Sequence, residues 1–160
     1  PRPGATPPIW IANNPHLFAA AGGPLAARAL DRVARLADGW MTAFATPEQF
    51  RRTWGDIQER ARRHGRDPAA FETALYYGTQ VDDKPEAAFR EAKRFLDTYY
   101  GGDFGEDRIR LWTAYGTPEE CATEVRRYLD AGVQNLLLRF PAYDQMTQLK
   151  RFVDEVYPRI

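Results

Sequence analysis

Apolar and polar positions along the chain follow two spacings, one typical of buried strands and one typical of amphipathic helices. Continuous apolar runs predict four strands, at residues 7–12, 40–44, 71–81 and 133–140. Between these runs, apolar residues recur at helical spacing along one stripe. Such stripes predict helices at residues 24–38, 47–63, 84–99, 118–131 and 144–157. The chain therefore reads as strand, helix, strand, helix, strand, two helices, strand, helix.

Two near-identical segments, "TPEQF" at 46–50 and "TPEEC" at 117–121, carry the signals of a helix start. In each segment the threonine is a good N-cap and the proline suits the first helical position. Gln49 and Glu120 can then reach back to their caps in a capping box. We also expect Asp83 to cap the helix that follows it.

Glycine stands at two joints between a helix and the next strand. Gly39 follows "RLAD" directly, and Gly132 precedes the run at 133–140. Because glycine adopts the left-handed conformation without a steric cost, we expect Gly39 to be a C-cap that lets a strand begin at once. The tight joints then lie at one end of the sheet and the long polar loops at the other.

The order of elements predicts the fold class. Strands that alternate with helices form a parallel sheet, because a parallel crossover needs a long connection. We therefore expect an α/β fold of four parallel strands with covering helices, and we expect chemistry at the C-terminal ends of the strands. A TIM-type (β/α)8 barrel needs twice as many strands, so the chain corresponds to half of one, or to an open sheet.

Composition and charge narrow the range of partners. The 160 residues are 44% hydrophobic and 13% aromatic, enough for one packed domain. Lys plus Arg and Asp plus Glu are balanced at 22 each, which gives no reason to expect nucleic acid or a membrane as a partner. Cys121 is the single cysteine, which indicates a reducing compartment. With no apolar run near the ~20 residues of a membrane span and no signal peptide, we expect a cytoplasmic protein.

Several segments, in order along nearly the whole chain, carry a family resemblance. They are "PPIWIANNP", "RALDRVARLADGWMT", "TPEQFRRTWGDIQERARRHGRDP" and "GTPEECATEVRRYLDAGVQNLLLRF", with "VDEVYP" near the end. Together they resemble the C-terminal half of the bacterial luciferase-like monooxygenases. That resemblance implies half of a TIM-type barrel, and a cofactor that is either flavin mononucleotide (FMN) or the deazaflavin coenzyme F420. We expect a single segment over 1–160, with a proline-rich lead-in at 1–8 and an aromatic, glycine-rich insertion loop at 101–116.

The loop after the first strand is the candidate cofactor site. Amide side chains and backbone N–H groups before a helix can hold a phosphate, and this loop offers Asn13 and Asn14, then Gly22 and Gly23. In the family the matching loop contributes to the cofactor phosphate site, so the resemblance implies the same role here. The alternative is a turn in which the asparagines bond to their own backbone.

Other strand ends supply candidates for substrate or anion binding, namely Thr42 and Arg139. Alternation places either Leu137 and Arg139, or Leu138 and Phe140, on the interior face. Arg139 could bind an anion, and the alternative is a rim arginine paired with Asp144.

The two histidines are assigned no catalytic role. We expect His16 to be solvent-exposed, and we assign His64 to the helix dipole. No metal-ligand spacing or nucleophile motif stands out, and the catalytic residues stay unassigned.

These observations favour part of an FMN- or deazaflavin-dependent oxidoreductase or monooxygenase acting on a small molecule. We expect the segment to be inactive alone, since in the family most acid–base and ring-contacting residues lie in the other half. It would act as a homo-oligomer or with a missing N-terminal half. The alternative is a stand-alone half-barrel that dimerises as a non-catalytic binding or structural module. A flavodoxin-like open sheet is disfavoured because that architecture needs helices on both faces of the sheet, and "AAAGG" after the first strand is not a dinucleotide-type glycine motif.

Overall fold

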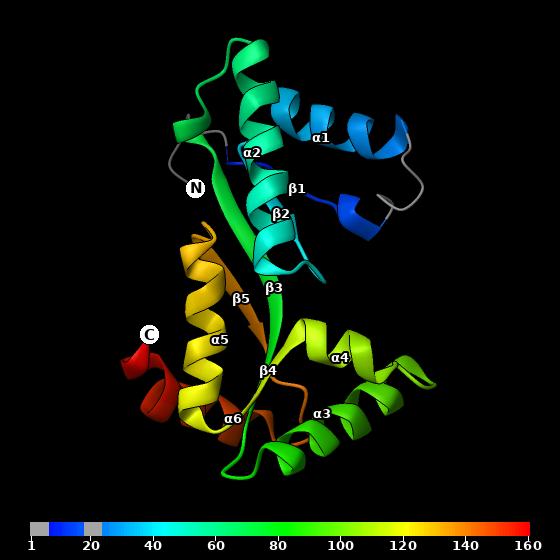
Figure 1. Cartoon of the computed structure of the whole chain (residues 1–160), viewed down its shortest axis with the longest axis vertical. Helices are drawn as coiled ribbons and strands as arrows, with labels where there is room; N and C mark the ends of the chain where they lie inside the picture. Colours follow the sequence, from blue (N-terminus) through cyan, green and yellow to red (C-terminus); the bar gives the residue numbers. More distant parts are fainter. Residues whose placement is uncertain (1–6, 18–23) are drawn as a thin grey trace. The chain divides into compact units, whose positions relative to one another are not determined.

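The computed structural model describes residues 7–17 and 24–160. Helices alternate with parallel strands, which confirms the α/β class (Figure 1). The strands are β1 (Trp10–Ala12), β2 (Gly39–Thr42), β3 (Glu72–Val81), β4 (Thr113–Gly116) and β5 (Asn135–Arg139). The α-helices are α1 (Pro24–Leu36), α2 (Pro47–Arg63), α3 (Pro85–Tyr100), α4 (Glu106–Trp112), α5 (Pro118–Asp130) and α6 (Gln145–Arg151). Short helical turns cover Pro15–Leu17 and Pro68–Ala70, and α6 continues through a π-helical turn, Phe152–Val156, into Tyr157–Arg159. None of the helices in the described ranges is long and apolar enough to span a bilayer.

The chain divides into two compact units. The first runs to Leu75 and also takes Gly132–Asn135, and the second holds Tyr76–Ala131 and Leu136–Ile160. Strand β3 contributes its first half to one unit and its second half to the other.

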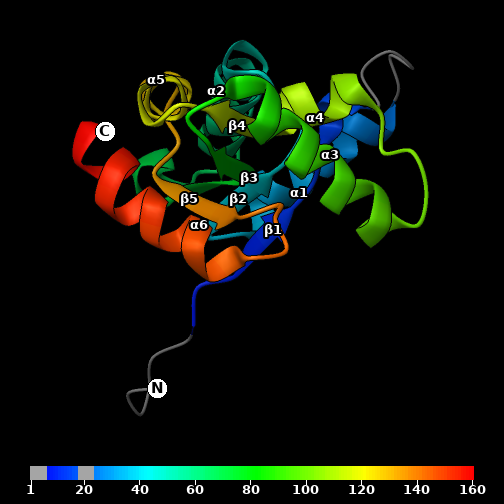
Figure 2. The ribbon, with the colours of Figure 1, turned by 90° about the horizontal axis from the view of Figure 1, so that it is seen from below.

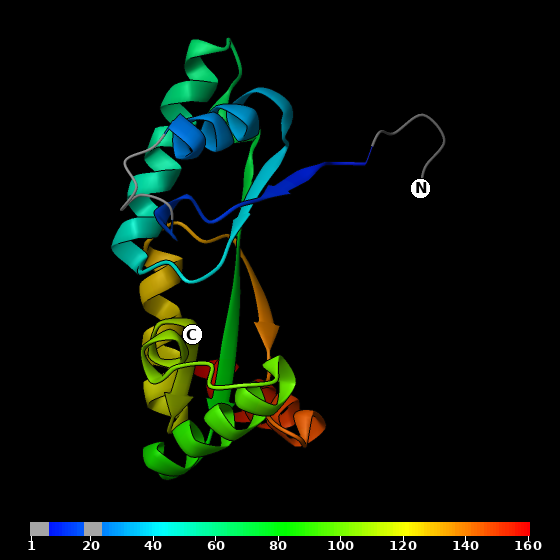
Figure 3. The ribbon, with the colours of Figure 1, turned by 90° about the vertical axis from the view of Figure 1, so that its right-hand side faces the viewer.

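In the first unit, β2 lies between β1 and the first half of β3, parallel to both. Helices α1 and α2 pack against each other on one side of the β1–β2 pair (Figure 3). Their apolar stripes supply the core as the spacing predicts, with Leu30, Val33, Ala34, Phe50, Ile57 and Ala61 buried. The helices therefore form where the sequence pattern places them, with α1 ending at Leu36.

A short segment far along the sequence completes this unit at Thr73. The Thr73 N–H donates to the Gln134 side chain at 2.9 Å, and the Thr73 hydroxyl donates to the Gly132 carbonyl at 2.7 Å. The same hydroxyl accepts from the Gln134 N–H at 3.0 Å, and the Asn135 side chain donates to the Thr73 carbonyl at 3.2 Å. Buried Thr73 thus has its polar groups satisfied by residues 132–135.

The predicted role of Gly39 as a left-handed C-cap is wrong. Gly39 is the first residue of β2, and it is absent from the glycines with positive φ. A Cβ there would lie 2.6 Å from the Trp10 ring and 2.9 Å from the Glu72 carbonyl oxygen. Glycine is therefore needed for close packing between neighbouring strands. Gly132, in contrast, has a φ of +104°, which other residues rarely adopt.

In the second unit, β4 pairs in parallel with the second half of β3, with Gly78 opposite Thr113 and Val81 opposite Gly116. Helix α5 covers this pair, and the ring of Tyr128 packs 4.8 Å from that of Tyr77. The C-terminal helical turns lie beside α5 (Figure 2). Strand β5 also pairs with β3.

The prediction that residues 101–116 form a loop is wrong, because this segment contains α4 and β4. Both depend on contacts with β3, which lies outside this segment. The Trp112 indole donates to the Tyr76 carbonyl at 2.7 Å. The missing side chain of Gly78 leaves room for Thr113, whose Oγ1 would lie 2.7 Å from a Cβ at position 78. The single-domain organisation over 1–160 stays a prediction.

Both capping boxes form as predicted. The Thr46 and Thr117 hydroxyls accept from the N–H groups of Gln49 and Glu120, whose side chains bond back to the threonine N–H groups. The prediction that Asp83 caps α3 is wrong, since Lys84 holds the N-cap position without a side-chain cap bond.

Candidate functional site

The C-terminal ends of β1 and β2 are joined through the two predicted asparagines. The Asn14 Oδ1 accepts from the Thr42 hydroxyl at 2.9 Å and from the Ala43 N–H at 2.8 Å. The Asn13 Oδ1 accepts from the Trp40 indole at 2.9 Å. Asn13, Asn14 and Thr42 therefore do come together, and the oxygens of both amides hold this loop against β2.

The amide nitrogens of the asparagines have fewer partners than the oxygens. Asn13 Nδ2 makes one long bond, 3.3 Å, to the Ala29 carbonyl. Within the described ranges, no hydrogen bond is recorded for Asn14 Nδ2. An amide nitrogen carries two N–H donors, so donors at this strand end stay available to an anion.

His16 lies in the helical turn after β1, and its predicted exposure is wrong. The residue is half-buried, and neither ring nitrogen makes a hydrogen bond of good geometry within the described part of the chain. Burial lowers the pKa of His16, and the nearby backbone of Ala43 and Phe44 opposes only part of this effect. His16 is therefore a neutral imidazole at neutral pH, with unused hydrogen-bonding capacity.

Two further features near the C-terminal ends of β1 and β2 were not predicted from the sequence. Phe44, just after β2, has a φ of +56°, which is strained for a bulky residue and is commonest at functional sites. A cavity of about 360 Å³ is lined by His16 and Pro15 together with Ala26, Leu30, Arg52, Thr53 and Asp56. Arg52 and Asp56 bring one positive and one negative charge to its lining. Phe44 and His16 follow strands and could have been noted for that reason, whereas Arg52, Thr53 and Asp56 lie on α2 and no local sequence pattern links them to this loop.

Gly22 and Gly23, the other predicted cofactor-binding residues, lie outside the described residues. They stay predictions.

Arg139 is the last residue of β5 and lies among aromatic rings. Its guanidinium carbon is 4.0 Å from the Tyr99 ring centroid, and Nη1 is 3.4 Å from the hydroxyls of Tyr76 and Tyr100. Phe140, the next residue, instead packs against Phe152. The predicted alternative, a pair with Asp144, is not present.

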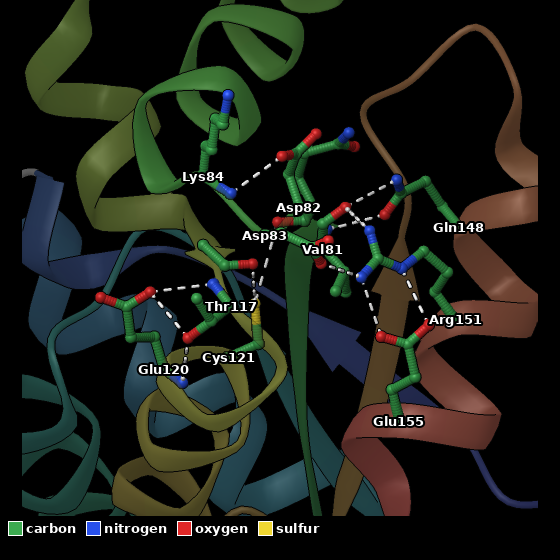
Figure 4. Close-up of polar contacts among 12 residues, drawn as sticks. Val81, Asp82, Asp83, Lys84, Thr117, Glu120, Cys121, Gln148, Arg151 and Glu155 are labelled. Carbon is green, nitrogen blue, oxygen red and sulfur yellow. Dashed lines mark hydrogen bonds and ion pairs between the residues drawn. The ribbon is translucent and has the colours of Figure 1, made fainter.

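The end of β3 is held by side chains of α5 and α6 (Figure 4). Gln148 bonds to both backbone groups of Val81, and Arg151 pairs with Glu155 at 2.8 Å and with Asp83 at 2.7 Å. Cys121 is buried, and burial raises the pKa of its thiol to about 12, which rules against a thiolate nucleophile. This network is structural. No group of three or more metal-ligating side chains occurs in residues 7–17 and 24–160.

Comparisons with known proteins agree with this architecture. The sequence profile of the luciferase-like monooxygenases matches residues 1–135. F420-dependent glucose-6-phosphate dehydrogenase 1 of Rhodococcus jostii is 24% identical over 90% of this chain and 48% of its own length. The F420-dependent glucose-6-phosphate dehydrogenase of Kribbella flavida is 24% identical over 89% of this chain and 48% of its own length. The chain spans about half the length of the curated relatives it matches.

Solved structures show the same relation. An F420-dependent secondary alcohol dehydrogenase in complex with an F420–acetone adduct superposes with a TM-score of 0.76 at 20% identity, covering 98% of this chain and 50% of that one. The coenzyme F420-dependent tetrahydromethanopterin reductase of Methanopyrus kandleri gives 0.69 at 18% identity, covering 94% and 50%. The prediction of half a TIM-type barrel is thereby confirmed. The described residues form one strand more than the four predicted from the sequence, namely β4.

Proposed function

Because the chain belongs to the luciferase-like monooxygenase family, we propose that it is part of an oxidoreductase that uses the deazaflavin coenzyme F420, with FMN as the other candidate. The relatives named above are F420-dependent enzymes, and this observation favours F420. Such a cofactor supplies hydride or oxygen chemistry, and the protein supplies its position and its electrostatic surroundings. The substrate is a small molecule.

The proposed cofactor-binding residues are Asn13, Asn14, Gly22 and Gly23. Support comes from the donor set at the ends of β1 and β2, where amide N–H groups and the buried His16 nitrogens keep unused hydrogen-bonding capacity. Asn13 and Asn14 would donate to the phosphate while their oxygens keep the loop in place. Thr42, whose hydroxyl is bonded to Asn14, would orient that amide.

The substrate- or anion-binding role of Arg139 is the second part of the proposal. Its guanidinium has no ion pair within 4.0 Å in the described part of the chain, so its charge is available to a ligand.

Asn14→Asp tests the cofactor site most directly. Aspartate keeps the oxygen that accepts from Thr42 and Ala43, removes the N–H donors and adds a negative charge facing the phosphate. We expect F420 to bind at least about tenfold more weakly, because a hydrogen bond to a charged group is worth roughly 1.5–3 kcal/mol. Calorimetric titration of F420 and of FMN into the protein measures the effect and identifies the preferred cofactor.

Gln58→Glu on α2 is the matched control, since it makes the same amide-to-carboxylate change on a half-buried side chain outside the loop. This control variant should bind F420 with the same affinity as the unchanged protein. If Asn14→Asp also binds as tightly, the loop is a turn and the phosphate assignment is withdrawn.

The final part of the proposal concerns assembly. We expect the chain alone to lack turnover, because in the family most acid–base and ring-contacting residues lie in the other half. We also expect it to self-associate, since among the described residues β1 pairs with a strand on its β2 side only. Sedimentation velocity at micromolar concentration tests this. A monomer would contradict the self-association, and turnover by that monomer would contradict the requirement for a second half.

A further inference from the structure

We propose that Arg139 and the tyrosines around it bind an aromatic anion, a ring compound that carries a carboxylate or a phosphate. This inference deepens the proposed anion-binding role of Arg139 and is independent of the cofactor assignment. All of the residues involved belong to the second unit.

The guanidinium is held in one orientation by its neighbours. It stacks on Tyr99 at 4.0 Å and lies 5.5 Å from the Phe95 ring centroid. Nη1 contacts the hydroxyls of Tyr76 and Tyr100 at 3.4 Å, which is long for a hydrogen bond. The remaining N–H groups of this planar fork have no recorded partner in the described ranges. A bidentate anion is the ligand that such a fork fits best.

Two other arginines that stack on rings in the described part of the chain also have a carboxylate partner. Arg110, over Phe89, pairs with Glu106 at 3.4 Å. Arg94, over Tyr143, pairs with Glu91 at 2.8 Å.

Arg139 differs from them in the described part of the chain, since no carboxylate lies within ion-pair distance of it. Asp144, the nearest acidic residue in sequence, accepts instead from the N–H and hydroxyl of Thr147 at 3.0 and 2.8 Å. A half-buried positive charge without a counter-ion is unfavourable, so an anion supplied by a ligand would complete the site.

The surroundings of Arg139 favour an anion attached to a ring. Tyr99, Tyr100 and Tyr143 are 62%, 50% and 53% exposed, although their rings form one aromatic cluster with Phe95. Exposed aromatic faces next to a cation offer stacking area to a planar ligand while its charged group reaches the guanidinium. An inorganic anion would contact the guanidinium but could not stack on the aromatic rings.

Calorimetric titration with phenyl phosphate and benzoate, and with inorganic phosphate and acetate as ring-free counterparts, tests the proposal. We expect the ring compounds to bind at least tenfold more tightly than their counterparts, and added salt to weaken them. Arg139→Gln should lose at least tenfold in affinity for both ring compounds, and Arg139→Lys should retain part of it. Tyr99→Leu should reduce the preference for a ring.

Arg110→Gln is the matched control, because it removes a stacked arginine that already has a carboxylate, and it should bind like the unchanged protein. Thermal unfolding of each variant shows that the fold is retained. Equal binding by Arg139→Gln, or equal affinity for phosphate and phenyl phosphate, overturns the proposal. The proposal is also overturned if no anion binds and Arg139→Gln only alters self-association. Arg139 and the tyrosines around it would then form a protein-docking surface. F420 affinity measured with Asn14→Asp is unaffected by any of these outcomes, so the two proposals fail separately.

Discussion

Gln148 on α6 bonds to Val81 as a neighbouring strand would: its Oε1 accepts from the Val81 N–H at 2.7 Å and its Nε2 donates to the Val81 carbonyl at 3.0 Å (Figure 4). The last residue of β3 thereby has both backbone groups satisfied by one buried side chain. An unpaired buried backbone group is costly, so the amide is more important for stability than its place on a helix suggests.

Replacing that amide should therefore destabilise the fold. We expect Gln148→Leu to lower the free energy of unfolding by about 1–3 kcal/mol, since it leaves the buried Val81 N–H without its acceptor, while the Val81 carbonyl keeps a bond from Arg151 at 3.3 Å. Urea denaturation measures this. Gln145→Leu, on an exposed position of the same helix, should change the midpoint little, and equal effects of the two substitutions would contradict the assigned role.

Thr117→Ala should lower the free energy of unfolding by about 1 kcal/mol, because the Glu120 N–H loses its acceptor at the start of α5. Denaturation of this variant is compared with that of Thr123→Ala, an exposed threonine within the same helix. Thr123 has no capping role, so its loss should cost clearly less. An unchanged midpoint for Thr117→Ala would show that the capping box adds nothing measurable.

Cys121 should resist thiol reagents in the folded protein. Its side chain is fully buried, and burial raises the pKa of its thiol to about 12, so little thiolate exists near neutral pH. Labelling with a chromogenic disulfide should be slow in buffer and fast in denaturant. Rapid labelling of the native chain would mean that α5 separates from β3 and β4 readily.

Acid should weaken the α3–α4 connection through Asp97. Hydrogen bonds from Lys93 and from the Phe104 N–H hold the pKa of Asp97 below its usual value. A lowered carboxyl pKa contributes stability above the unfolded-state value of about 3.9, and this contribution is lost as the pH falls through the lower folded-state pKa. We therefore expect Asp97→Asn to reduce the loss of stability on acidification.

Urea midpoints measured from neutral pH down into the acid range check this expectation. The control is Asp154→Asn, an exposed aspartate of the C-terminal helical turn. If Asp97→Asn and the unchanged protein lose stability in parallel on acidification, the Lys93–Asp97 contact does not contribute.

Structural features that depend on residues close together in the sequence were predicted correctly. Each capping box joins residues three positions apart, so Thr46–Gln49 and Thr117–Glu120 are visible in the sequence itself. The strands and helical stripes are likewise local patterns. They were sufficient for the fold class.

The errors concern contacts between distant residues. Gly39 is required by the Trp10 ring, and Asp83 pairs with Arg151, 68 residues away, instead of capping α3. Strand β4 exists because β3 offers it an edge, a fact that no window around residues 113–116 contains. Of the candidate site, Asn13, Asn14 and Thr42 were predicted from their place after strands, whereas the burial of His16 depends on packing that one sequence does not reveal.

The bonds between Thr73 and residues 132–135 also bear on how the chain is made. A ribosome delivers the N-terminal residues first, but the polar groups of buried Thr73 obtain their partners only once Asn135 has been synthesised. Most of the second unit is translated in that interval. The residues of the first unit up to Leu75 therefore leave the ribosome before that unit can be completed. Nascent chains that stop before Gly132 should be more sensitive to protease around Thr73 than chains that extend past Asn135.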